Sequence, residues 1–312
     1  MIGKVNTTPA AAVIIPTHNR ADLLKKTLDS VLAQSVACEI FVMDDASKDT
    51  TREMVPRDYP QVHYHREEIN QGPTFLRNKG ARLSTAPFIF TIDDDCVLAS
   101  PKIVEQAIEA FNHPRVGAVT LPFINVLQDD QLRKGTEKNG IILTTFDYLG
   151  GMIAFSRSAY ELAGGYRSYL FMHVEEADLA IRLLQRGYVV RVGWSDPIDH
   201  FESPVRNQSR LDVLEGRNHV LYCFYNVPWP YFPVHLLATS VNCLRIGRRK
   251  GSVLTAIRGL SRGYGGMVHE FFQRKAVSGT VYRLSRLMKA RHEMKLEEIE
   301  PLLPPLQTKA GA

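Results

Sequence analysis

The sequence predicts an α/β protein with a doubly wound, mostly parallel sheet. Short apolar runs at 11–16, 39–43 and 88–92 have the length and composition of buried strands. Segments whose apolar residues recur at helical spacing separate these runs, and polar turns join them. Such alternation is typical of a layered α/β fold, and 312 residues are enough for one large or two small domains.

The elements of the first hundred residues follow one another regularly. The run at 11–16 ends in a proline, and residues 21–35 place leucines on one face behind an acidic start, which predicts an amphipathic helix. The next predicted elements are a strand at 39–43, a helix starting near Thr50 and a short strand at 62–64. A turn at 70–73 then precedes a helix that includes Leu76 and Leu83, and a strand follows at 88–92. No GxGxxG motif follows these strands and no GxxxxGK[ST] occurs, which argues against a dinucleotide site and a P-loop.

The second half of the predicted sheet is less regular. Its elements are a helix at 101–111, a strand at 116–121, a polar, loop-like segment at 125–140, an apolar run at 152–155, a short helix at 158–163, a helix from 175 and a strand at 189–192. Glycine pairs at 150–151 and 164–165 stand beside these elements, and turn geometry is their simplest explanation.

Three adjacent aspartates, Asp93, Asp94 and Asp95, directly follow the strand at 88–92. Ligands bind at the carboxyl ends of strands in open α/β sheets, and neighbouring carboxylates repel one another unless a cation offsets their charge. A hard divalent ion such as Mg²⁺ or Mn²⁺ prefers oxygen ligands and is usually shared with substrate phosphates. The triplet predicts a metal–diphosphate site, with a solvated acidic turn as the alternative.

Two other predicted strands end in polar groups of the kind that bind ligands. Thr17 and Asn19 follow the first strand, and Asp44 and Asp45 follow the second. Right-handed crossovers place such strand ends along one edge of the sheet. We therefore expect a nucleotide to lie across this edge.

A second acidic cluster opens the helix that starts at 175. It consists of Glu175, Glu176 and Asp178. Acids at a helix N-terminus complement the helix dipole, so capping is the simplest explanation of this cluster. His200 follows the last predicted strand, where a core or loop histidine and a ligand-binding histidine are both consistent with the sequence.

The net charge of +5 is unevenly distributed. Residues 240–292 contain twelve Lys or Arg and one acid, so the rest of the chain is net acidic. Aromatic residues precede and enter this basic part, which predicts either a helical appendage packed on the rest or an in-plane contact with an anionic membrane surface. Nucleic acid is not an expected partner, because no known binding module is present.

Cysteine usage and hydropathy indicate a reducing compartment. The four cysteines have no CxxC or Cys/His spacing, which is typical of free thiols in a cytosolic protein. No uncharged stretch reaches the ~20 apolar residues of a spanning helix, and the apolar run near the N-terminus is too short for a signal peptide. We expect a cytoplasmic protein, peripheral on the inner face of the cell membrane if the basic part contacts lipid.

Taken in order, these motifs resemble family 2 glycosyltransferases of the GT-A fold, a Rossmann-like fold of nucleotide-diphospho-sugar transferases. The resemblance covers about residues 10–225 and rests on VIIPTHNR (13–20), DDASKDT (44–50), RNKGA (77–81), DDD (93–95), GG (150–151), GGY (164–166), EEADLAIRL (175–183) and His200. It implies a catalytic domain at 1–220 and a basic, aromatic-rich helical C-terminal extension at 221–312.

The resemblance also implies a donor and an acceptor. The donor is a sugar linked to UDP, GDP or dTDP, and the acceptor is a glycan or lipid-linked hydroxyl. It implies a hexosyltransferase-type reaction, usually with inversion, in polysaccharide, lipopolysaccharide or glycolipid biosynthesis.

Individual site residues follow from the same resemblance. The nucleotide and diphosphate are expected beside Pro16, Thr17, Asn19, Arg20, Asp44, Asp45, Gly72, Arg77, Asp93 and Asp94. Asp93 and Asp95 match the family's DxD motif for Mn²⁺ or Mg²⁺, and His200 matches a histidine that often closes the metal or diphosphate site. Glu176 matches the catalytic base, which is usually an aspartate in the family, with Glu175 as the alternative and Asp178 in a structural role.

The chemistry of glycosyl transfer also requires a divalent ion at the diphosphate and a separate carboxylate base. Glycosyl transfer passes through an oxocarbenium-like state while negative charge leaves on the diphosphate, which a divalent ion stabilises. The attacking hydroxyl must lose a proton, which a separate carboxylate can accept. A sugar nucleotidyltransferase is one alternative, but its glycine-rich basic loop is missing after the first strand. A non-catalytic scaffold that binds nucleotide sugar or membrane is the other, and the intact acidic clusters argue against it.

Overall fold

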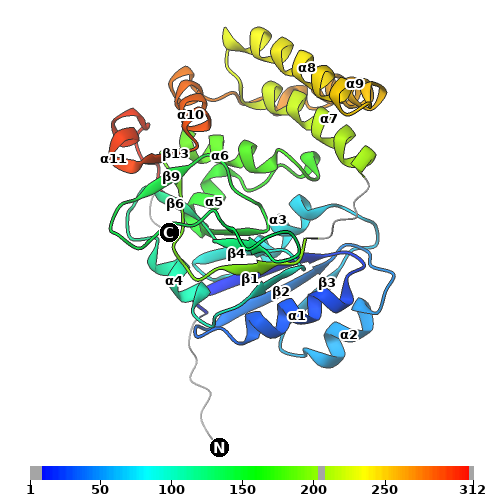
Figure 1. Cartoon of the computed structure of the whole chain (residues 1–312), viewed down its shortest axis with the longest axis vertical. Helices are drawn as coiled ribbons and strands as arrows, with labels where there is room; N and C mark the ends of the chain where they lie inside the picture. The colour runs from blue at the N-terminus through cyan, green and yellow to red at the C-terminus, as the bar shows by residue number, and fades with distance from the viewer. Residues whose placement is uncertain (1–8, 203–207, 309–312) are drawn as a thin grey trace, which may run out of the picture.

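A nine-stranded mixed sheet runs through the centre of the protein (Figure 1) in the computed structural model, which describes residues 9–202 and 208–308. In spatial order its strands are β13 (Glu293–Lys295), β9 (Leu143–Thr145), β11 (Val189–Arg191), β6 (Val116–Thr120), β10 (Met152–Ser156), β4 (Phe88–Ile92), β1 (Ala11–Thr17), β2 (Cys38–Asp44) and β3 (His63–Arg66). The strands β4, β1, β2 and β3 are mutually parallel, whereas β10 runs antiparallel to both β4 and β6. The predicted α/β class is confirmed.

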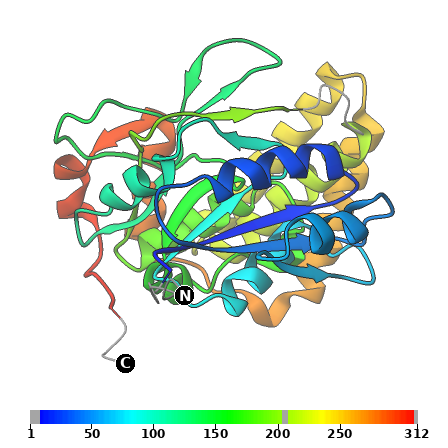
Figure 2. The ribbon, with the colours of Figure 1, turned by 90° about the horizontal axis from the view of Figure 1, so that it is seen from below.

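Helices cover both faces of this sheet. One face carries α1 (Ala21–Leu32), α2 (Thr51–Asp58) and α4 (Ile103–Glu109). The other carries α3 (Pro73–Leu83), α5 (Arg157–Ala163), α6 (Glu175–Gln185), α10 (Gly279–Arg291) and α11 (Leu296–Ile299). Figure 2 shows α1 and α2 lying across the parallel strands.

The alternation of side chains along β1 explains why both faces need a cover. Val13 and Ile15 share one buried cluster with Leu28 of α1, whereas Ile14 shares the opposite cluster with Leu76 of α3. The side chains of Val13, Ile14 and Ile15 are all fully buried. Successive residues of a strand point to opposite faces, so a continuous apolar run requires burial on both sides.

A second, four-stranded sheet lies beside the carboxyl end of β4. Its order is β5 (Cys96–Leu98), β12 (Ile198–His200), β7 (Phe123–Asn125) and β8 (Leu132–Arg133). The strands β7 and β8 form an antiparallel hairpin within the segment expected to be a loop. The pairing of β12 with β5 and β7 brings His200 opposite Cys96 and Asn125, which fixes its position next to the acidic strand end.

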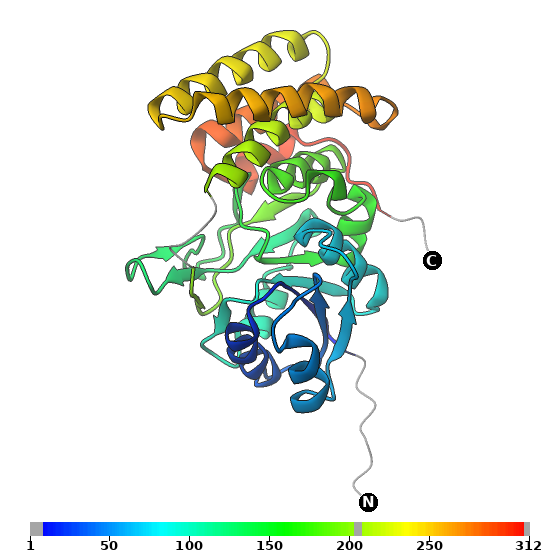
Figure 3. The same cartoon turned by 90° about the vertical axis from the view of Figure 1, so that its right-hand side faces the viewer.

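Three long helices form an outer layer over the second face, drawn at the top of Figures 1 and 3. They are α7 (Gln208–Asn226), α8 (Tyr231–Arg249) and α9 (Val253–His269). The expected domain boundary at 220 falls in the middle of α7, so the helical layer starts earlier than the sequence suggests. Among the described residues, no helix combines the length and the apolar character needed to cross a membrane.

The C-terminal residues return to the sheet. The strand β13 pairs with β9, and Ile299 of α11 is fully buried in the core shared with α6. Arg115 donates to Glu300 at 3.1 Å and to the carbonyl of Pro304 at 3.0 Å. A frayed tail is the natural expectation from the prolines and charges after 297. The described part of this segment instead completes one edge of the catalytic sheet.

Candidate active site

A cavity of about 680 Å³ opens at the carboxyl ends of β1, β2 and β4. Both predicted acidic clusters contribute to its wall, although they come from distant parts of the chain. The predicted residues that line it are Pro16, Thr17, Arg20, Asp45, Arg77, Asp93, Asp94, Asp95, Glu175, Glu176 and His200. Four others, Asn19, Asp44, Gly72 and Asp178, lie outside its lining.

The middle aspartate, Asp94, fastens two strand ends to each other. It accepts hydrogen bonds from the Thr17 hydroxyl at 2.8 Å and from Arg20 at 3.0 Å. Burial raises the pKa of Asp94 to about 7, against the opposing effect of Arg20. Asp94 therefore connects β4 to β1 and positions the aspartates on either side of it.

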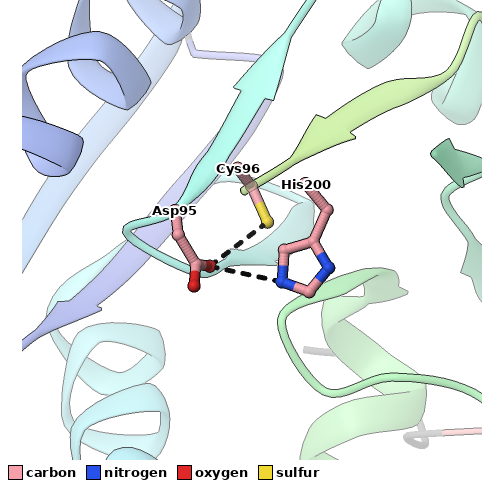
Figure 4. A group of neighbouring side chains, drawn as sticks. All are labelled: Asp95, Cys96 and His200. Carbon is pink, nitrogen blue, oxygen red and sulfur yellow. Dashed lines mark hydrogen bonds and ion pairs between the residues drawn. The ribbon is translucent and has the colours of Figure 1, made fainter. Parts of the chain in front are cut away.

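Asp95 is held in its charged form by two neighbours. Arg20 donates to one of its oxygens at 2.8 Å, and His200 Nε2 lies 3.4 Å from the other (Figure 4). Burial acts to raise its pKa, but His200 and Arg20 outweigh burial and lower it. The Cys96 sulfur lies within 4.8 Å of both the Asp95 and the His200 ligand atoms. Burial raises the pKa of Cys96 well above its usual value, so it stays a neutral thiol.

The imidazole of His200 is oriented for ligation through Nε2. Its Nδ1 donates to Asn125 Oδ1 at 2.6 Å. The Asn125 amide nitrogen lies 3.2 Å from Gln128 Oε1, an acceptor, so the amide oxygen is the atom that faces the histidine. A metal-binding histidine typically donates its other ring N–H in this way. A carboxylate and an imidazole fit Mn²⁺ better than Mg²⁺, which favours oxygen ligands alone.

The first aspartate of the triplet, Asp93, faces a different partner. Its carboxylate accepts from Arg77 Nη2 at 2.8 Å. A Cβ atom on Gly151 would collide with this carboxylate, and one on Gly150 would lie 2.5 Å from Arg77 Nη1. Neither glycine has a positive φ, so close packing rather than turn geometry requires this pair. The pair at 164–165 does have positive φ values, of 83° and 62°, as expected for a turn that ends α5.

The acids of α6 occupy three different environments. Glu176 lines the cavity, and its Oε1 accepts from the Gly150 N–H at 3.3 Å. Glu175 is buried, and its burial and the adjacent Glu176 raise its pKa well above the usual value, although Arg77 opposes this. Asp178 is fully buried and accepts hydrogen bonds from Arg167, Arg182 and Asn226, so it connects α6 to its neighbours.

The segment before α6 has an unusual backbone. Phe171, His173 and Val174 all have positive φ values, between 65° and 69°, and such values are rare for non-glycine residues and rarer still for the β-branched Val174. The side-chain amide of Asn218 on α7 lies 2.7–2.8 Å from the carbonyls of Leu170, Met172 and His173. The outer helical layer thus holds the segment that delivers Glu175 and Glu176 to the cavity.

The two residues expected to contact the base, Asp44 and Asp45, stabilise the loops at the carboxyl end of β2. Both Asp45 oxygens accept backbone N–H groups, from Gln71 at 2.6 Å and from Gly72 at 2.9 Å. Asp44 is fully buried and accepts from Ser47 and Tyr64. Asp45 alone of the two carboxylates reaches the cavity wall.

Two further predicted residues of this turn region have supporting positions. Asn19 Oδ1 accepts from the Lys48 backbone at 2.6 Å. Gly72 has a φ of 84°, and a Cβ there would lie 2.5 Å from the Phe171 ring. Both positions therefore shape the loops beside the carboxyl ends of β1 and β2 without lining the cavity.

Sequence reasoning missed Asn125 and Asn218. Asn125 lies in a segment expected to be a loop, and only the pairing of β7 with β12 brings it to His200. Asn218 gave a weak signal, because asparagine in the middle of a helix is unfavourable unless its amide is used elsewhere. Its side chain is fully buried, which is consistent with that signal.

A second cavity, of about 580 Å³, lies between α7, α8 and α10. Its charged wall residues include Asp212 paired with Lys250 at 2.9 Å and Glu215 next to His219 at 3.6 Å. It contains none of the aspartates of the strand end and lies on the other side of α7 from the first cavity. The chemistry predicted from the sequence therefore belongs to the larger cavity.

The mixed sheet, with its cavity at the strand ends, has the arrangement of a GT-A fold. Solved structures share this fold. A mannosyltransferase from Pyrobaculum calidifontis, solved with GDP-Man and Mn²⁺, aligns with 91% of this chain and 85% of its own, at 19% identity and a TM-score of 0.55. TarS from S. aureus, solved with UDP-GlcNAc, aligns with 94% of this chain and 90% of its own, at 13% identity and a TM-score of 0.59. At these identities the likeness is one of fold.

The family model for glycosyl transferase family 2 matches residues 12–176, which is more than half of the chain, and the protein belongs to this family. Validoxylamine A glucosyltransferase of Streptomyces hygroscopicus is 38% identical over 127 residues, 39% of this chain and 30% of that protein. A GalNAc(5)-diNAcBac-PP-undecaprenol beta-1,3-glucosyltransferase of Campylobacter jejuni is 33% identical over 113 residues, 34% of this chain and 37% of that protein. The matched region thus spans less than two fifths of either relative.

Proposed function

We propose that the protein is a metal-dependent, inverting glycosyltransferase that moves a sugar from a nucleotide diphosphate to an acceptor hydroxyl. One observation carries the proposal. The acids at the end of β4 and those at the start of α6 line one cavity, with Arg77 between them. One acidic cluster is thereby available for a metal and the other for proton removal, which are the two groups that the reaction requires.

The donor diphosphate would bind on the β4 side of the cavity. Asp95 and His200 would hold the divalent ion, with Asp93 as the second aspartate of the DxD motif. The ion, when bound, would supply positive charge against the charge that develops on the leaving diphosphate. Arg77 adds a second cation there, since its Nε and Nη1 have no hydrogen-bond partner among the described residues. The donor would be linked to UDP, GDP or dTDP.

Glu176 is the proposed general base. It is partly exposed to the cavity, and the hydrogen bond from the Gly150 N–H fixes one of its oxygens. Glu175 is a poorer candidate, because its side chain is buried and its raised pKa disfavours the carboxylate form that would accept the proton. As Glu176 takes the hydroxyl proton, attack of the acceptor oxygen on the anomeric carbon from the face opposite the leaving diphosphate would give inversion.

The acceptor would enter beside the outer helices. Leu149, Phe171, Leu211 and Leu214 line this part of the cavity and offer an apolar wall. A glycan or lipid-linked acceptor fits such a wall, and the Campylobacter relative is named for an undecaprenol-linked one. We therefore place the reaction in polysaccharide, lipopolysaccharide or glycolipid biosynthesis at the cytoplasmic face of the membrane.

Donor turnover provides the test. The protein is incubated with a panel of UDP-, GDP- and dTDP-sugars, with Mn²⁺, with Mg²⁺ or with EDTA, and free nucleotide diphosphate is measured with and without candidate acceptors. The proposal predicts metal-dependent release of diphosphate with one donor, and an inverted anomeric configuration of the product by NMR. Pyrophosphate-dependent exchange with the nucleotide sugar would instead identify a nucleotidyltransferase. Full activity in EDTA would refute the proposed metal dependence.

A further inference from the structure

Exposed apolar side chains gather on the outer helical layer. Of the 22 large hydrophobic residues that are exposed in the described part of the chain, 13 lie between residues 229 and 272. Scattered single exposures are normal on a soluble protein, whereas a contiguous apolar patch marks an interaction surface. This concentration therefore requires an explanation that the cavity does not provide.

Most of the exposed residues on α8 and α9 form one stripe on each helix. At 100° per residue, each stripe falls within an arc of about 80° of its helix. On α8 the stripe is Val234, Leu237, Val241 and Leu244, and on α9 it is Leu254, Ile257, Tyr264 and Val268, and together these eight residues are called the outer face. A hydroxyl–hydroxyl contact of 2.8 Å between Ser240 and Tyr264 joins the two helices alongside the stripes.

The opposite side of α9 is the side that packs on the protein. Its buried residues include Gly259, Gly263 and Gly266. A Cβ on Gly263 would lie 2.7 Å from Val220, and one on Gly259 would lie 2.9 Å from the carbonyl of Val213. The helix α9 is therefore fixed closely against α7, and its apolar stripe points away from α7, into solvent. Figure 3 shows α8 and α9 side by side across the outside of the molecule.

Basic side chains flank the outer face. Arg245 and Arg249 on α8 and Arg258 and Arg262 on α9 are all exposed. Within the described residues, an ion pair is found for none of these four. The single acid of this region, Glu270, accepts from the Tyr225 hydroxyl at 2.9 Å and is turned toward the protein. The layer thus presents uncompensated positive charge around an apolar centre.

Aromatic residues mark one end of the helix pair. Trp229 precedes α8 and is 67% exposed, and Phe271 and Phe272 follow α9 and are 63% and 91% exposed. Because α8 and α9 are antiparallel neighbours, these three residues lie at the same end. Aromatic side chains at such positions favour the headgroup depth of a bilayer.

We propose that the outer face, with its aromatic end, binds an anionic lipid bilayer in the plane of the membrane. An amphipathic pair of helices with basic flanks combines apolar insertion with attraction to anionic headgroups. A protein partner would have to be strongly acidic around an apolar centre, which an anionic membrane provides without further assumption. The surface lies away from the cavity, so this inference and the proposed transfer reaction can fail separately.

The full-length protein is tested by co-sedimentation with vesicles of phosphatidylcholine alone or with 30% phosphatidylglycerol. We expect binding to the anionic vesicles, weak binding to neutral ones, and a decrease with added salt. Arg258→Gln with Arg262→Gln should weaken binding about tenfold or more, because each basic residue near an anionic surface contributes several-fold. Leu237→Glu with Ile257→Glu should abolish it.

Matched controls separate the surface from general effects. Leu83→Glu replaces a comparably exposed leucine on α3, and Arg52→Gln with Lys25→Gln removes two exposed charges from the opposite side of the sheet. These controls should bind vesicles as the wild type does, and circular dichroism should show that all variants fold. Equal binding to neutral and anionic vesicles, or unchanged binding by both outer-face variants, would overturn the proposal. So would a lipid-free dimer that Leu237→Glu converts to monomer.

Discussion

Arg77 and Asp93 form an ion pair of 2.8 Å in which the arginine side chain is 4% exposed. Glu175 lies 3.5 Å from the other terminal nitrogen of the same guanidinium. Burial acts to lower the pKa of Arg77, but Asp93, Tyr166 and Glu175 outweigh burial and raise it, so the group stays charged. One buried cation therefore connects the end of β4 to the start of α6 and sets the spacing between the two acidic clusters.

Removing this cation should destabilise the fold. Arg77→Met leaves the Asp93 carboxylate, which is 38% exposed, without its partner. Loss of one member of a fully buried pair costs about 3–5 kcal/mol, so we expect a smaller cost here, of about 1–3 kcal/mol. Urea denaturation monitored by circular dichroism measures the change. The control is Arg57→Met, which removes an exposed pair with Asp58 and should leave the midpoint unchanged. An equal, small effect of both variants would mean that Arg77 does not hold the clusters together.

The acidic strand end was predictable because it is encoded locally. A buried strand followed by carboxylates specifies both the sheet edge and the charge, and the structure places Asp93, Asp94 and Asp95 on the cavity wall as expected. The different structural roles of the three aspartates were not predictable. Asp94 is used to connect strands, and this depends on contacts with Thr17 and Arg20, more than seventy residues earlier in the sequence.

The helical layer was predicted less well for a similar reason. Composition identified a basic, aromatic-rich region, but the position of its boundary depends on α7, whose N-terminal half lines the cavity and whose C-terminal half packs in the outer layer. The return of β13 to β9 is a contact between residues 150 positions apart, and three residues of strand give no recognisable pattern.

The two glutamates of α6 should respond differently to the same substitution. Glu176→Gln should lower kcat about 10²–10⁴-fold with donor binding retained, because it removes the proposed base and little else. Glu175→Gln should lower kcat much less, since Glu175 is buried, its raised pKa favours the neutral form, and a glutamine resembles that form. Initial rates with saturating donor and acceptor, together with donor affinity by calorimetry, provide the measurement. An inactive Glu175→Gln with an active Glu176→Gln would reverse the assignment.

The metal site should depend on a residue that does not touch the metal. Asn125→Leu removes the acceptor that orients His200, and loss of such a partner typically weakens metal affinity about 10–100-fold. Binding of Mn²⁺ is followed by its electron paramagnetic resonance signal, without any substrate. Cys96→Ala is the matched control and should bind Mn²⁺ normally, because a neutral thiol is a poor ligand. Wild-type affinity in Asn125→Leu would place the metal elsewhere.

Acid should destabilise the helical layer through His235. Burial and the cations Arg286 and Lys289 of α10, together with His219 of α7, lower the pKa of His235 to about 4, and its Nδ1 lies 2.8 Å from the Tyr282 hydroxyl. The unfolded chain binds a proton near pH 6.5 and the folded chain does not, so stability falls as the pH drops from about 6.5 to 4.

Comparison of variants isolates this contribution from that of the carboxylates. His235→Gln should reduce the loss of stability between pH 7 and pH 4 by about 1–2 kcal/mol, a figure that allows for partial exposure of the ring. The free energy of unfolding is measured by urea titration at each pH. His63→Gln, at an exposed histidine of β3, should leave the wild-type pH dependence intact. Parallel curves for His235→Gln and wild type would contradict the prediction.

Asn218 should control the position of the proposed base from outside the cavity. Its amide hydrogens are shared among three carbonyls of the segment before α6, where three non-glycine residues adopt positive φ values. In Asn218→Asp the shape is conserved, but carboxylate oxygen replaces the donor and faces those carbonyls, which leaves buried acceptors unsatisfied at about 1–3 kcal/mol. The segment should then relax toward ordinary backbone angles.

Two measurements distinguish this positioning role from a general loss of stability. Hydrogen exchange at 169–174 should accelerate more than exchange in β1, and kcat should fall more than donor affinity, because the proposed donor site is on the β4 side. Asn242→Asp changes an exposed asparagine on α8 and should affect neither quantity. If exchange accelerates uniformly while kcat is retained, Asn218 serves only to stabilise the packing of α7. If exchange accelerates mainly at 169–174 and kcat falls, the outer helices position the proposed catalytic carboxylate.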